Sequence, residues 1–88
     1  MQVLAICRPR PAADVSELAR LAPQEAERLR QLQATGRLLA AYSPGTPGAV
    51  LVLEASNVDA AEELVSDLPL AAAGLIQAEL IGLYPLAY

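Results

Sequence analysis

Apolar residues recur along the chain with two spacings, and these predict its secondary structure. Residues 3–7 (VLAIC) form a short apolar run that an Arg-Pro-Arg-Pro segment closes, which is typical of a strand followed by a loop. From Ser16 onward the apolar residues fall on one helical stripe, and Pro23 predicts the start of a fresh helix. Gly36 is placed to end this helical region with a positive φ.

The second half of the chain predicts three strands and one helix. A turn-rich segment, SPGTPG, separates the first two of these strands. Ser56 or Asn57 caps the helix and Leu68-Pro69 stops it, so that a connector of small residues leads to the last strand. The expected strands cover residues 37–42, 49–55 and roughly 76–83.

The order of elements is β-α-β-β-α-β, which predicts an α+β, ferredoxin-like fold in one domain spanning residues 1–88. In this fold both helices cover the same face of a four-stranded antiparallel sheet. Strands 3–7 and 49–53 are nevertheless apolar at every position, as in strands that are buried on both faces. The same face of another copy is the simplest cover, so the sequence predicts a sheet-to-sheet homodimer that forms a barrel.

The last strand divides its side chains between the two faces. Ile76, Ala78 and Leu80 share one face, whereas Gln77, Glu79 and Ile81 share the other. The fully apolar set belongs under the helices, which leaves Glu79 between the two sheets of the dimer. There it is a general acid or base in an apolar pocket, an interface carboxylate paired with an Arg of either copy (Arg8 or Arg37), or a carboxylate left at a hydrated rim.

Composition and charge narrow the classes of partner and chemistry. The 88 residues are 55% apolar and carry a net charge of −4 without any Lys, which argues against nucleic acid as a partner. No His is present and no cluster of metal-ligating residues is apparent, so no metal site is expected. The lone Cys7 and the lack of a signal peptide favour the cytoplasm. Pro69, Gly74 and Glu79 interrupt the apolar 68–85 stretch, which argues against a membrane span.

Two short motifs carry a resemblance to a known family. Leu68-Pro69-Leu70, followed at a matching distance by Tyr84-Pro85, resembles the muconolactone isomerase family of the dimeric α+β barrel superfamily. The similarity covers nearly the whole chain. It implies a cytoplasmic homo-oligomer built from barrel dimers. It also implies cofactor-independent proton transfer on a small lactone, a chemistry of aromatic compound catabolism.

The resemblance also implies site residues. The acidic positions on the family's last strand match Gln77 and Glu79, and Tyr84 stands where the family's isomerases have a His. Glu79 would then carry the proton, while Gln77 and Tyr42 or Tyr84 orient the substrate. Independently of the resemblance, Arg8 and Arg10 at the end of the first strand are candidates to hold a substrate carboxylate, although their position favours a solvated loop or a subunit salt bridge.

Two hypotheses for function follow. The first is a muconolactone isomerase-like enzyme that isomerises a small apolar lactone or carbonyl compound. The second is a non-catalytic module that binds a small ligand or oligomerises, having lost the family's polar site. The aliphatic strand 38–41 and the missing His favour the second hypothesis. A third, a small regulatory domain, is weaker because such domains are usually appended to an enzyme.

Overall fold

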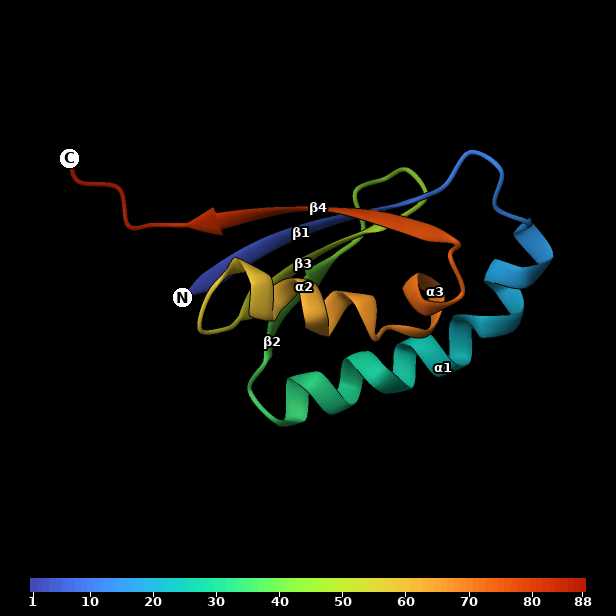
Figure 1. Cartoon of the computed structure of the whole chain (residues 1–88), viewed down its shortest axis with the longest axis horizontal. Helices are drawn as coiled ribbons and strands as arrows, with labels where there is room; N and C mark the ends of the chain where they lie inside the picture. The colour runs from blue at the N-terminus through green and yellow to red at the C-terminus, as the bar shows by residue number, and fades with distance from the viewer.

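The computed structural model describes residues 1–88 and has the predicted order of main elements (Figure 1). Two helices and one short helical turn lie on one side of a four-stranded sheet. The elements are β1 (Gln2–Pro9), α1 (Val15–Ala34), β2 (Leu38–Tyr42), β3 (Ala49–Glu54), α2 (Val58–Ser66), α3 (Pro69–Ala72) and β4 (Ile76–Leu83).

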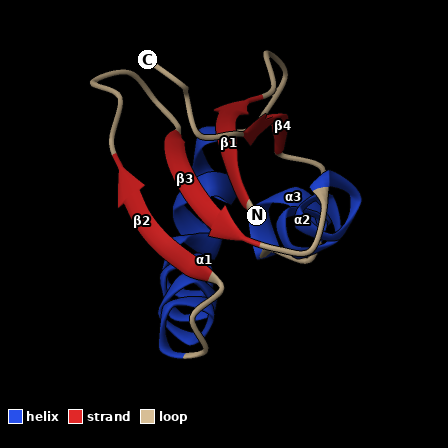
Figure 2. Cartoon of the chain, turned by 90° about the vertical axis from the view of Figure 1, so that its left-hand side faces the viewer, coloured by secondary structure: helices blue, strands red, loops and turns tan.

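The sheet has the order β2-β3-β1-β4, and every neighbouring pair of strands is antiparallel (Figure 2). The outer strands are therefore β2 and β4, and β1 and β3 lie inside the sheet. This is the ferredoxin-like α+β arrangement that the sequence predicts. A register irregularity between Leu38 and Ala40 interrupts the pairing of β2 with β3.

Two sequence expectations about prolines are wrong. Helix α1 runs without a break through Pro23, so no fresh helix starts there. Proline removes one backbone hydrogen bond, to the carbonyl of Ala19, but both residues are exposed and water can replace that bond. Strand β1 extends to Pro9, and Arg8 therefore belongs to the sheet instead of the following loop.

The ends of the helices follow from their local sequences. Gly36 has a φ of 76°, directly after the capping residue Thr35, as predicted for the end of the first helical region. The side chain of Asn57 accepts a hydrogen bond of 2.7 Å from the Ala60 N–H and so caps α2. The small-residue connector after Leu68 is not a plain loop, because Pro69 opens the short helix α3.

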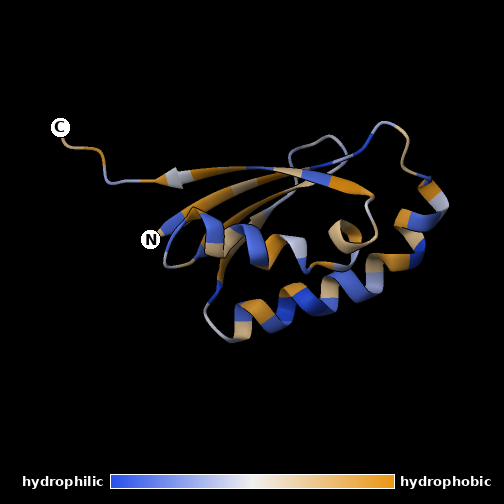
Figure 3. Ribbon diagram, viewed as in Figure 1, coloured by the Kyte–Doolittle hydropathy of each residue, from blue (hydrophilic) through white to orange (hydrophobic).

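The hydrophobic core lies between the helices and one face of the sheet. Val3, Ala5 and Cys7 from β1 meet Leu51 and Leu53 from β3 on this face, which we call the covered face. The opposite face has no helix over it, and we call it the open face. Figure 3 shows apolar colouring along the strands, in agreement with the expectation that the inner strands are apolar on both faces.

Candidate functional site

The last strand has the predicted division of side chains. Ile76 is buried under the helices, and Ala78 and Leu80 on the same face are half-buried. Gln77 and Glu79 point from the open face and are exposed in the single chain. The predicted carboxylate and amide therefore lie on the face that no helix covers.

Arg8 joins these two residues on the open face. It lies directly opposite Gln77 in the pairing of β1 with β4, so that both side chains leave the same face. Its Nη1 atom is 3.7 Å from Oε1 of Glu79, an ion pair that is longer than a hydrogen bond. We call Arg8, Gln77 and Glu79 the polar end of the open face.

Tyr42 shares this face but does not contact the polar end. The strand registers place Tyr42 opposite Val50, Val50 opposite Ile6, and Ile6 opposite Glu79. These four residues form one row across the sheet, and three strand spacings put Tyr42 about 14 Å from Glu79. The phenol is 61% exposed, so its hydroxyl is available to a ligand or to another copy.

Tyr84 lies at the other end of β4. It follows the strand, is 78% exposed, and lines a shallow cavity with Met1, Gln2 and Glu54 among its neighbours. Tyr84 is five positions after Glu79, a span of about 16 Å in extended chain. Within one chain the structure therefore does not bring Tyr84 to the polar end.

Cys7 is on the covered face and takes no part in this site. It is 4% exposed and free. Burial, and secondarily the negative charge of Glu25, raise the pKa of its thiol to about 11. A thiol in this state behaves as a small apolar residue of the core.

Sequence reasoning missed the role of Glu25. Its carboxylate accepts a hydrogen bond of 3.0 Å from the backbone N–H of Leu70, so that α1 caps the start of α3. Burial raises the pKa of Glu25, and the hydrogen bond from Leu70 opposes that rise only in part. The two residues are 45 positions apart, and no local pattern could have paired them.

Two further features bear on the kind of site. No group of three or more His, Cys, Asp or Glu side chains gathers closely enough to hold a metal ion. None of the helices is both long and apolar enough to cross a lipid bilayer.

Comparison with solved structures identifies the fold. The chain is 20% identical to 5-chloro-2-hydroxyhydroquinone dehydrochlorinase (TftG) from Burkholderia phenoliruptrix AC1100, solved in complex with 2,5-dihydroxybenzoquinone. That match has a TM-score of 0.77 and covers 96% of this chain and 94% of the other. Muconolactone isomerase is 21% identical, with a TM-score of 0.78, over 98% of this chain and 91% of the other.

These matches confirm the resemblance to muconolactone isomerase as a likeness of fold. No curated protein sequence matches the chain significantly. The sequence model of one family, described as the YCII-related domain, matches residues 1–81. The chain therefore belongs to the YCII-related domain family.

Proposed function

We propose that this protein is a cofactor-independent enzyme that moves a proton on a small, largely apolar lactone or carbonyl compound. The observation that carries the proposal is the polar end of the open face. Arg8, Gln77 and Glu79 meet at one end of the open face, whose inner strands are aliphatic from there up to Gln2 and Glu54 at the other end. A carboxylate beside hydrogen-bond donors, next to an apolar surface, is suited to proton transfer on a substrate that is itself apolar.

Each residue of the polar end has a distinct role in this proposal. The Glu79 carboxylate takes a proton from one carbon of the substrate and returns it to another. Arg8 has five N–H donors, and its 3.7 Å separation from Glu79 leaves them available to the oxygen on which negative charge develops. The Gln77 amide, opposite Arg8, orients the same ligand.

A second copy on the open face would complete the site. In the single chain Glu79 is more than half exposed, and its water would compete with any substrate. Docking the same face of another copy would exclude that water and could bring Tyr42 or Tyr84 of the partner toward the polar end. The complex of TftG with 2,5-dihydroxybenzoquinone favours a ring with carbonyl and hydroxyl oxygens as the ligand class.

Proton exchange in deuterated water tests this proposal. The protein is incubated in D₂O with a panel of small lactones and hydroxyquinones, and NMR follows the loss of carbon-bound protons. We expect exchange in at least one compound, and a loss of about a hundredfold or more for Glu79→Gln, the size typical of removing a general base. Glu27→Gln, a change on the exposed side of α1, is the matched control and should exchange at the original rate. Equal rates in both variants would contradict the proposal.

A second candidate function is a non-catalytic module that binds a small ligand or holds copies together. The ion pair between Arg8 and Glu79 favours it, since a carboxylate already paired with an arginine can be an interface contact. Sedimentation of Glu79→Gln separates the two candidates. If the pair is structural, Glu79→Gln weakens the dimer by roughly 3 kcal/mol or more, because Arg8 is left without its partner. The double variant Glu79→Gln with Arg8→Gln should then recover part of that loss. If Glu79 is catalytic, the dimer persists in the single variant.

A further inference from the structure

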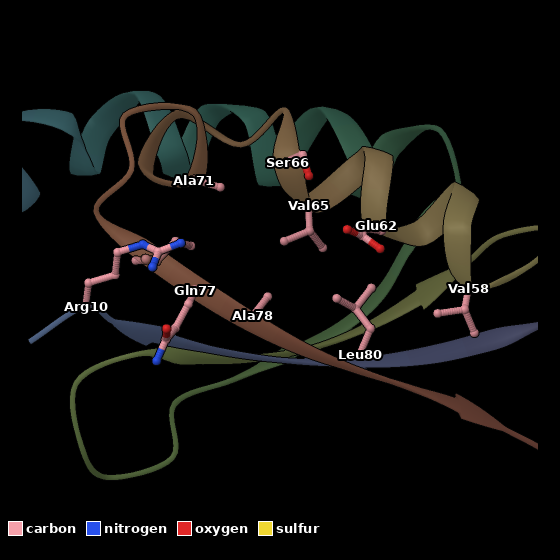
Figure 4. Close-up of a pocket in the computed structure, with 10 residues that line it drawn as sticks. Arg10, Val58, Glu62, Val65, Ser66, Ala71, Gln77, Ala78 and Leu80 are labelled. Atoms are coloured by element: carbon pink, nitrogen blue, oxygen red, sulfur yellow. The ribbon is translucent and has the colours of Figure 1, made fainter.

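A groove separates α2 from the edge strand β4, on the helix side of the sheet and away from the polar end (Figure 4). Its volume is about 470 Å³, within the range of small-molecule sites. Apolar side chains from α2, α3 and β4 form most of its lining: Val58, Val65, Ala71, Ile76, Ala78 and Leu80. Because β4 is the last strand of the sheet, the groove opens at the sheet edge.

Arg10 is the one cationic side chain that lines this groove. It forms no ion pair, unlike Arg8, Arg20 and Arg30. Its backbone N–H donates a hydrogen bond of 2.9 Å to the carbonyl of Leu75, which fixes its position beside the start of β4. Figure 4 shows the guanidinium group at one end of the groove, the end where Ala71 and Gln77 also lie. An unpaired guanidinium next to an apolar wall is suited to a carboxylate on an apolar body.

Glu62 gives the groove a second polar point on α2. In Figure 4 its carboxylate lies between Val65 and Val58, farther along the groove than Arg10. A carboxylate accepts hydrogen bonds only, so at this position it would select a hydroxyl group and repel a second anion. The groove thus has a donor group at one end, an apolar middle and an acceptor farther along.

We propose that this groove binds a small single-ring organic acid that carries a hydroxyl group opposite its carboxylate. The carboxylate pairs with Arg10, the ring packs on Val65, Ala78 and Leu80, and the hydroxyl donates to Glu62. This inference does not rest on the proposed function, because its side chains other than Gln77 lie on the helix side of β4. A copy docked on the open face would leave the groove accessible.

An NMR titration of the whole chain tests the proposal with benzoate, 4-hydroxybenzoate and 4-hydroxybenzamide as probes. We expect 4-hydroxybenzoate to bind most tightly and to shift the amide signals of Val65, Ala78 and Leu80 more than those of Leu4 and Ile6. Arg10→Gln should weaken both acids about tenfold or more and leave the neutral amide unaffected, as expected for loss of a charge-assisted pair. Arg10 is exposed, so this variant should fold normally.

Two other variants complete the test. Glu62→Gln should reduce the advantage of 4-hydroxybenzoate over benzoate, because the charged acceptor for the hydroxyl is lost. Arg8→Gln should leave binding unchanged. The proposal is overturned if no acid binds at millimolar concentration, if Arg10→Gln has no effect, or if Arg8→Gln is the variant that weakens binding. That last outcome would assign the acid to the open face. If instead Glu79→Gln exchanged protons as fast as the control variant, the proposed function would fail but the groove proposal would be unaffected.

Discussion

The two faces of the sheet carry similar aliphatic side chains on their inner strands but have different surroundings. On the covered face Val3, Ala5, Leu51 and Leu53 are at most 2% exposed, because the helices pack on them. On the open face the alternating residues of β1 and β3, such as Leu4 and Val52, are only half-buried by their neighbours. The apolar pattern of a strand therefore predicts that a face of the sheet is buried, but it does not identify the helix or second copy that buries it.

The polar side chains of the strands are confined to one of these faces. The covered face contains no buried polar or charged side chain, and its one thiol has a raised pKa. Arg8, Gln77 and Glu79 all leave from the open face. A charged group on the covered face would lose its hydration, whereas on the open face it stays hydrated until a ligand or a second copy arrives. The open face is thus where assembly and the proposed proton transfer are expected.

The largest expected effect is loss of packing on the covered face. Leu51→Ala removes a side chain that is 2% exposed and should lower the free energy of unfolding by about 2–5 kcal/mol. Chemical denaturation at several protein concentrations measures it. Val52→Ala changes the neighbouring residue, which faces the open side of the sheet, and should lower the free energy of unfolding less. This smaller loss should appear only at protein concentrations where a dimer is populated. Equal costs at every concentration would mean that the two faces are energetically alike.

The next effect concerns the cover of the open face. The protein should sediment as at least a dimer at micromolar concentration, with an interface of about 1,200–2,000 Å² or more. Ile81→Arg places a charge at this interface and should weaken the dimer about a hundredfold or more. Val15→Arg, an exposed position at the start of α1, should leave the assembly unchanged. A stable 9.2 kDa monomer of the wild type would refute the dimer.

A smaller effect is expected at the turn that leads α1 from the helical layer to β2. Gly36 has a φ of 76°, and a Cβ there would meet no atom within 4 Å, so any cost of substitution comes from the backbone alone. Gly36→Val should lower the free energy of unfolding by roughly 1 kcal/mol or more. Gly36→Asn should cost less, since Asn tolerates this conformation. Thermal denaturation of both variants tests this, and equal stability of wild type and Gly36→Val would contradict it.

The smallest effect is a pH dependence on the covered side. The pKa of Glu25 is higher in the folded chain than in the unfolded chain, so folding favours its protonated form. The stability that this preference contributes is complete below the ordinary pKa of 4.5 and is lost as the pH rises through the folded pKa. Glu25→Gln removes this titration and keeps an acceptor for the Leu70 N–H. The variant should therefore gain stability relative to wild type between acidic and neutral pH. Glu27→Gln, a change on the exposed side of the same helix, is the matched control, and an identical gain of stability in that variant would refute the assignment to Glu25.

Local sequence patterns were sufficient for most of the secondary structure. The apolar runs gave the inner strands, Gly36 and Asn57 marked helix ends, and the alternation of residues 76–83 assigned Glu79 to the open face. The exceptions were prolines. Pro23 lies inside α1 because its missing hydrogen bond is on an exposed turn, and Pro9 ends β1 instead of starting a loop. Local sequence does not report solvent exposure, so these two outcomes could not be foreseen.

The sequence by itself determined the βαββαβ order, the two apolar faces and the side from which each residue of β4 points, because these depend on periodicities within single elements. Only the tertiary structure decided which distant residues meet. It placed Arg8 beside Glu79 and left Tyr42 and Tyr84 apart from them. It also joined Glu25 to Leu70 and brought Arg10 into a groove with Glu62. The physical reason is strand register, since a pairing shifted by two residues preserves every apolar pattern yet changes every polar neighbour.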